Sequence, residues 1–205
     1  MKTFLFTGLT ILSWLSIGTF AQHLQYSLQL QVPALTQSRV TSCGEAVIVM
    51  AYNYAYSQTP LTEPDVIQYA VLHSYYTPDH APFTSPANMA DLAKHYQAAY
   101  TTGNVANPAR ALNLLARNIQ QGQPVMIDVT TWLDQPYSGA HFILVTGLSI
   151  DPDNDKLVVT IHYNNPLTGR NESAPWDGKT GIWNAWQNNG DPGGAGWWLV
   201  ITPQK

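Results

Sequence analysis

The chain contains a single cysteine, Cys43, so it cannot form an intramolecular disulfide bond. Small extracellular folds commonly depend on disulfides for stability, and this route is closed here. The fold must therefore be held by a hydrophobic core. The composition allows this, because 45% of the residues are hydrophobic and only 11% are charged. About 180 residues of this kind can bury one substantial core.

The first 21 residues have the pattern of a secretory signal peptide. A basic residue near the start is followed by an apolar stretch over residues 4–17 and by small residues up to Ala21. The apolar part is shorter than a comfortable membrane span, which favours cleavage near Ala21 over stable membrane insertion. We therefore expect a secreted or periplasmic protein in which residues 22–205 form one domain. The sequence does not indicate an oligomeric state.

The charge and the histidine pattern argue against two classes of partner. The net charge is −4 at pH 7, and removal of Lys2 with the signal peptide makes it more negative. An acidic chain is a poor match for nucleic acid, which is bound by clusters of Lys and Arg. No two histidines have metal-ligand spacing with a supporting Cys or Glu. We therefore expect no metal and no other cofactor.

Helical patterns occupy the first half of the chain and strand patterns the second. After an alternating strand at residues 24–32, helices are predicted to begin at four places: at Cys43 with Ser42 as N-cap, at Thr62, at Ser85 and at Asn107. Short apolar runs then predict strands at residues 124–129, 141–150, 157–163 and 197–202. Helices gathered before a mostly antiparallel sheet predict an α+β fold with a cleft between the two parts.

Four residues form a pattern typical of thiol catalysis. Cys43 is predicted at a helix N-terminus, where the helix dipole and a nearby imidazolium would lower the pKa of its thiol. His141 could act as the base, and Asn165 could orient the imidazole. Gln37 is the candidate to donate a hydrogen bond to the developing oxyanion, opposite the backbone N–H of Cys43.

Strand pairing provides a geometric reason to group His141 with Asn165. If the turn DPDND centres on Asp153, residues whose numbers sum to 306 face each other, and His141 then lies opposite Asn165. A shift of one residue would instead bring Asn164 into play. The alternation of apolar residues favours Asn165.

These residues resemble those of papain-like cysteine peptidases, and within them the double-glycine-leader (bacteriocin-processing) peptidase-like family. The similarity rests on TQSRVTSCGEA, with Gln six residues before Cys-Gly, on GAHFILVTGL, and on YNNPLTG, with Asn before Pro-x-x-Gly. It spans about residues 32–202. The resemblance implies a papain-like fold with a helical part packed on an antiparallel sheet. It also implies a cysteine peptidase in which Cys43, His141, Asn165 and Gln37 act as nucleophile, base, orienter and oxyanion donor.

Two positions depart from the usual pattern of that family, which has Asp where Asn165 stands and a small residue or Pro where Glu45 stands. A carboxylate beside a thiolate is electrostatically unfavourable. Three functions remain open. The favoured one is a secreted hydrolase that cleaves peptide or isopeptide bonds in a peptide or protein substrate. The others are a non-catalytic secreted binding module on the same fold and a transglutaminase-like acyl transferase.

Overall fold

The computed structural model of the chain describes residues 26–153 and 156–203. The predicted signal peptide at residues 1–21 lies outside the described residues. The helices are α1 (Cys43–Ala55), α2 (Glu63–Leu72), α3 (Pro86–His95), α4 (Pro108–Gln120) and α5 (Ile182–Gln187). The strands are β1 (Tyr26–Gln29), β2 (Ala99–Asn104), β3 (Val125–Thr130), β4 (Ala140–Asp153), β5 (Lys156–Asn165), β6 (Arg170–Pro175) and β7 (Trp197–Thr202).

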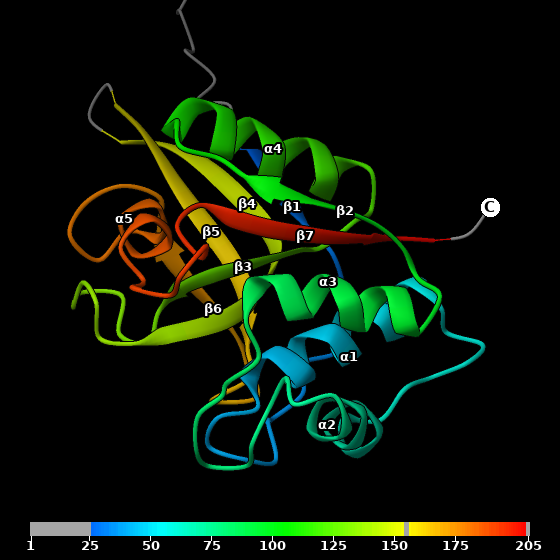
Figure 1. The fold of residues 1–205 in the computed structure, drawn as a ribbon. Helices are drawn as coiled ribbons and strands as arrows, with labels where there is room; N and C mark the ends of the chain where they lie inside the picture. Colours follow the sequence, from blue (N-terminus) through cyan, green and yellow to red (C-terminus); the bar gives the residue numbers. More distant parts are fainter. Residues whose placement is uncertain (1–25, 154–155, 204–205) are drawn as a thin grey trace, which may run out of the picture.

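The strands form one antiparallel sheet that is covered by helices on both faces (Figure 1). Its order is β2-β7-β3-β4-β5-β6, and β1 pairs with β4 in addition. Helices α1 and α3 cover one face, with α2 packed against α1, and α4 covers the other face, with α5 near one end of it (Figure 1). The α+β prediction is confirmed. None of the helices in the described part of the chain has the length and apolar character of a membrane span.

Alternation along the central strands separates the two halves of the core. On β3, Met126 packs with α1 and α3, whereas Val125 and Ile127 pack with α4 and α5. Strand β4 repeats the pattern, with Leu144 on the first side and Ile143 on the second. Every residue of β3 is buried, so the sheet centre forms the interior of the molecule on both faces.

Helix starts follow the capping residues in the sequence. The side chains of Thr62, Ser85 and Asn107 each accept a hydrogen bond from the backbone N–H three residues later, and Pro follows within two positions. Ser42 occupies the N-cap position of α1, but its side chain does not cap the helix. The Ser42 hydroxyl group is bonded to Arg39 and Glu63 instead.

Strands β2 and β6 and helix α5 were not predicted. Both strands lie at the edges of the sheet, and most of their residues are exposed, so they lack the apolar runs of the central strands. Their pairing with β7 and β5 is set by contacts distant in sequence. Helix α5 has only six residues, too few for a periodic pattern.

Candidate active site

Cys43 is the first residue of α1, and this helix is anchored in the core. Residues 44–52 are all buried, and the helix packs against β4. A Cβ at Gly44 would lie 2.9 Å from the Met89 sulfur and 3.3 Å from the Phe142 ring, so a larger residue after the cysteine would require these side chains to shift. The backbone N–H of Phe142 hydrogen-bonds the Cys43 thiol. The thiol therefore lies beside the residue that follows His141.

His141 and Asn165 are joined by a hydrogen bond of 2.9 Å between Nε2 and Oδ1. The amide of Asn165 is oriented by its other partners. Its Oδ1 accepts from the backbone N–H of Leu167 at 3.0 Å, and its Nδ2 donates to Glu172 Oε2 at 3.0 Å. Because Oδ1 can only accept, Nε2 of His141 must carry the proton. In the neutral ring, Nδ1 is then left as an unprotonated acceptor.

The pairing of His141 with Asn165 is not the one that the sequence predicted. The ladder pairs Leu144 with Asn164, a sum of 308, and beyond a bulge it pairs Gly147 with His162, a sum of 309. The predicted sum of 306 was wrong, and Asn165 is a diagonal neighbour of His141 instead of its direct partner. A shift of two positions keeps both residues on the same face of the sheet, where a diagonal contact remains within reach of their side chains.

The bulge between β4 and β5 lies where strand β1 begins to pair with β4. Strand β1 lies so close to β4 that a Cβ at Gly147 would be 2.6 Å from the carbonyl oxygen of Leu28. Thr146 is the extra residue of the bulge, and its carbonyl oxygen accepts a hydrogen bond of 2.8 Å from the backbone N–H of Leu30. The bulge thus accommodates β1 and restores the alternation on which the position of Asn165 depends.

Asn164 has a different role from its neighbour. It is fully buried, its Nδ2 donates to the Val32 carbonyl at 2.9 Å, and its Oδ1 accepts from Asn171 Nδ2 at 3.1 Å. These contacts attach the segment before α1 to the sheet. Of the two asparagines, only Asn165 has a hydrogen bond to His141 among the contacts of the described residues.

Gln37 lies in the loop that leads to Cys43. Its backbone N–H donates to the Pro166 carbonyl at 2.8 Å, which places it next to Asn165 in space. Its side-chain Nε2 donates to the carbonyls of Arg39 at 2.8 Å and Val40 at 2.7 Å, so both amide hydrogens have acceptors. The Gln37 Oε1 atom is buried and has no hydrogen-bond partner among the residues described. To act on an oxyanion, Nε2 has to release one of the two carbonyls.

The Cys43 thiol is held in its neutral form. Burial raises its pKa to about 12, and the carboxyl groups of Glu45 and Asp128 act in the same direction. The N–H groups of Phe142 and Gly44 oppose this shift without overcoming it. The sequence-based prediction of a lowered thiol pKa was wrong in direction, because it considered the helix terminus and not the burial of the sulfur.

The His141 imidazole is also held in its neutral form. Its side chain is buried, and burial lowers its pKa below 6.5, although Asn165 and Glu172 act in the opposite direction. The resting pair is therefore a thiol and an uncharged imidazole, not a thiolate and an imidazolium.

A neutral resting thiol should be visible in the pH dependence of alkylation. We expect iodoacetamide to modify folded Cys43 slowly at pH 7, with a rate that is still rising above pH 9, because only the thiolate reacts. The same cysteine in the urea-unfolded chain should follow an ordinary thiol pKa near 8.5 and react at least about tenfold faster at pH 8. A plateau below pH 7.5 in the folded protein would instead indicate a thiolate–imidazolium pair.

Two carboxyl groups that act electrostatically on the thiol, those of Glu45 and Asp128, were not predicted as site residues. Glu45 is fully buried and accepts a hydrogen bond from the Thr84 hydroxyl group. Asp128 is fully buried on β3; burial and the neighbouring Asp191 carboxyl raise its pKa well above its ordinary value. The sequence signals were an acidic residue in the first turn of a buried helix and an Asp inside the apolar run VMIDVT.

Glu45 should make the protein less stable as the pH rises. Burial raises its pKa from 4.5 to about 7, so the folded state binds a proton more tightly than the unfolded state. That stability is complete below pH 4.5 and is lost as the pH rises through 7, a difference of roughly 3 kcal/mol. Glu45→Gln should match the parent near pH 4.5 and exceed its free energy of unfolding by about 2–3 kcal/mol at pH 8.

Urea unfolding of the two proteins at both pH values measures this difference. Asp134→Asn removes an exposed carboxylate and serves as the matched control, with equal effects at the two pH values. An equal gap between Glu45→Gln and the parent at pH 4.5 and pH 8 would show that folding does not change the pKa of Glu45.

The chain is similar to a known protein family over most of its length. The family model described as "Peptidase_C39 like family" matches residues 29–193, which include Gln37, Cys43, His141 and Asn165. A comparison with curated proteins gives no significant match. The match covers most of the chain, agrees with the mixed helix and sheet architecture, and suggests a cysteine peptidase. The chain belongs to the Peptidase_C39 like family, whose members have a papain-like fold.

Proposed function

We propose that the protein is a cysteine peptidase that hydrolyses peptide or isopeptide bonds with Cys43 as its nucleophile. The observation that carries this proposal is the hydrogen bond from His141 Nε2 to Asn165 Oδ1. It fixes the imidazole tautomer in which Nδ1 can accept a proton, in a chain whose family suggests peptidase activity. The oriented imidazole belongs to the residue next to Phe142, whose backbone N–H bonds the Cys43 thiol, and an inert core cysteine would not require it.

In the proposed reaction, His141 acts as a general base because the thiol is neutral at rest. Nδ1 takes the thiol proton while the sulfur attacks the carbonyl carbon, and the carbonyl oxygen becomes an oxyanion. The backbone N–H of Cys43 and Nε2 of Gln37 would donate to that oxygen. His141 then protonates the leaving amine, which yields an acyl-thioester. Water, deprotonated by the same imidazole, releases the acid and restores the thiol.

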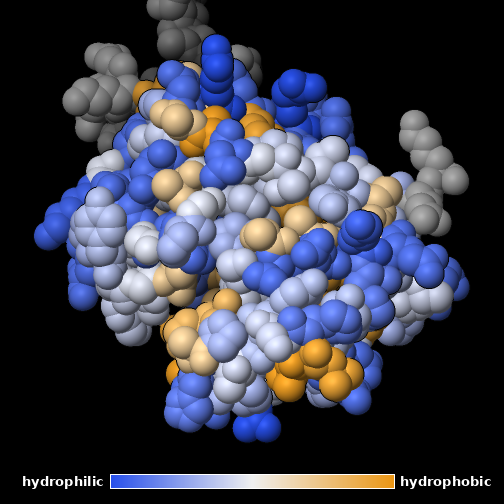
Figure 2. Space-filling model, viewed as in Figure 1, coloured by the Kyte–Doolittle hydropathy of each residue, from blue (hydrophilic) through white to orange (hydrophobic). Residues whose placement is uncertain are grey.

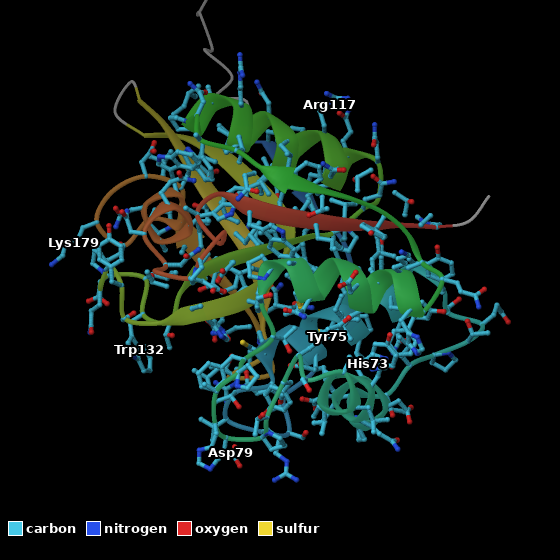
Figure 3. The ribbon with its side chains drawn as sticks, viewed as in Figure 1. His73, Tyr75, Asp79, Arg117, Trp132 and Lys179 are labelled. Atoms are coloured by element: carbon cyan, nitrogen blue, oxygen red, sulfur yellow. The ribbon has the colours of Figure 1, made fainter. Side chains whose placement is uncertain are left out.

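Exposed hydrophobic side chains in the loops before Cys43, Thr84 and His141 favour a substrate with apolar side chains. Val40, Phe83 and Trp132 are 80%, 53% and 54% exposed. Val40 lies between Gln37 and Cys43, Phe83 precedes the Thr84 that bonds to Glu45, and Trp132 projects outward from the loop before β4 (Figure 3). Figure 2 shows the hydrophobic residues of this view as separate groups on a mainly hydrophilic surface. Extracellular or periplasmic action is proposed from residues 1–21 alone.

A binding module without turnover is the second candidate. Two observations favour it: the Cys43 thiol is neutral, and both Gln37 amide hydrogens are already bonded to loop carbonyls. In that case the four residues would shape a peptide-binding surface, and Cys43 would be chemically silent.

One experiment separates these functions. The chain is incubated with a mixed peptide library and the products are identified by mass spectrometry, with Cys43→Ala as the control. New peptide termini that require Cys43 would support the hydrolase. Products in which two library peptides are joined, with a mass equal to their sum minus ammonia or an amine, would identify an acyl transferase. An unaltered library that is nevertheless retained by both proteins would identify the binding module and exclude the peptidase.

A further inference from the structure

We propose that Glu63 is a positioning residue that fixes the loop between Gln37 and Cys43; as a statement about catalysis, this rests on the proposed peptidase function. Glu63 is the first residue of α2, a helix that contributes none of the four site residues. Helices α1 and α2 pack together on the same side of the sheet (Figure 1).

The Glu63 carboxylate holds both ends of this loop. At one end, both of its oxygens accept from the backbone N–H of Ser38, at 3.0 and 2.9 Å. At the other end, Oε1 accepts from the Ser42 hydroxyl group at 2.6 Å. Ser38 directly follows Gln37, and Ser42 directly precedes Cys43. One side chain therefore connects the neighbours of the proposed oxyanion donor and the proposed nucleophile.

The burial of Glu63 shows that its position is not explained by the helix dipole alone. Glu63 is 5% exposed, whereas Asp65, in the same first turn of α2, is exposed and bonds to the Thr62 hydroxyl group. A carboxylate near a helix N-terminus gains from the dipole in either position. A buried carboxylate also loses its hydration and needs replacement donors, and the loop provides them through Ser38 and Ser42.

The inside of the loop is closed by its own hydrogen bonds. Gln37 Nε2 bonds to the carbonyls of Arg39 and Val40, and the backbone N–H of Arg39 donates to Ser42 Oγ at 3.1 Å. A side chain that caps a helix accepts from a backbone N–H of the first turn, and Ser42 Oγ accepts from the Arg39 N–H instead, while its hydrogen is donated to Glu63. With both ends attached to Glu63, the loop keeps a fixed spacing between its two proposed oxyanion donors.

Amide hydrogen exchange tests the attachment without any assay of activity. Glu63→Gln keeps the shape of the side chain but replaces one acceptor oxygen with an NH₂ group that faces the Ser38 N–H. We expect exchange in peptides covering residues 37–43 to rise at least about tenfold, with the sheet unchanged. Asp65→Asn is the matched control and should leave this segment unchanged. Ser42→Ala removes the second link and also the bond from the Arg39 N–H, so it should raise exchange between Arg39 and Cys43 and leave the Ser38 N–H protected by Glu63.

Kinetics test the positioning role. Glu63→Gln should lower kcat roughly 10- to 100-fold with KM within about threefold, because a small displacement of a catalytic donor is costly. In a chain that already carries Gln37→Ala, Glu63→Gln should lower kcat by less than about a further threefold, because Glu63 acts through the placement of Gln37.

The outcomes separate the proposal from its premise. Unchanged exchange over residues 37–43 in Glu63→Gln overturns the attachment, whether or not the parent turns over. Increased exchange across the whole chain assigns Glu63 a general stabilising role and also overturns it. The positioning role is overturned if exchange rises locally while kcat stays at the parent value. It is also overturned if Glu63→Gln lowers kcat by the same factor in the parent and in Gln37→Ala. A parent protein without turnover would reject the peptidase proposal, and with it the kinetic role of Glu63.

Discussion

Replacing His141 with alanine should lower kcat/KM for a cleaved peptide by roughly 10³- to 10⁴-fold, the upper part of the roughly 10²- to 10⁴-fold range for loss of a general base. The effect is large because the Cys43 thiol has a pKa of about 12 and supplies almost no thiolate unaided at neutral pH. In the parent, kcat/KM should rise with pH through the His141 pKa, which burial lowers below 6.5, because only the neutral imidazole accepts the proton. This rise should be absent from the variant. Initial rates measured between pH 4.5 and 9 provide the test.

His162 offers a matched control for this substitution. It is a partly buried histidine on β5 of the same sheet, and its Nε2 contacts the Ser149 hydroxyl group at 3.3 Å. His162→Ala removes the same imidazole volume and should change kcat/KM by less than about threefold. Equal losses in the two variants would indicate a structural effect on the sheet. Retention of full activity in His141→Ala would show that another group takes the thiol proton.

The parts of the fold that could be predicted are those determined by neighbouring residues. Thr62, Ser85 and Asn107 mark the starts of α2, α3 and α4 because a capping side chain acts within three residues. The central strands β3 and β7 were identifiable because both faces of the sheet are covered, which requires continuous apolar runs. The grouping of His141 with Asn165 survived an incorrect register because the error was an even number of residues.

The parts that could not be predicted depend on contacts distant in sequence. The edge strands β2 and β6 are polar, and only pairing with β7 and β5 makes them strands. The bulge at Thr146 depends on the close approach of β1. The raised pKa of Cys43 depends on burial by several elements and on Asp128 from β3, so a rule based on the helix terminus alone gave the wrong sign. The partners of Glu63 likewise lie 21 and 25 residues away.

Gln37→Ala should lower kcat by roughly 10²- to 10³-fold and leave KM nearly unchanged, which is the result for a donor that acts mainly in the transition state. In the free protein, Nε2 of Gln37 is bonded to the carbonyls of Arg39 and Val40. The buried Oε1 accepts no hydrogen bond from the described residues, so a rotation of the amide would not break a bond to this oxygen. Substrate binding would have to turn Nε2 toward the oxyanion at the expense of one loop carbonyl.

A peptide aldehyde separates this role from a general loosening of the loop. Aldehydes add to a catalytic thiol to give a tetrahedral hemithioacetal, whose oxygen occupies the oxyanion position. If Gln37 donates to that oxygen, Gln37→Ala should weaken inhibition by the aldehyde in proportion to the loss in kcat, while binding of the matching peptide alcohol stays the same. Equal weakening for aldehyde and alcohol would show that Gln37 contributes uniform binding. The oxyanion donor would then have to be sought among the backbone N–H groups next to Cys43.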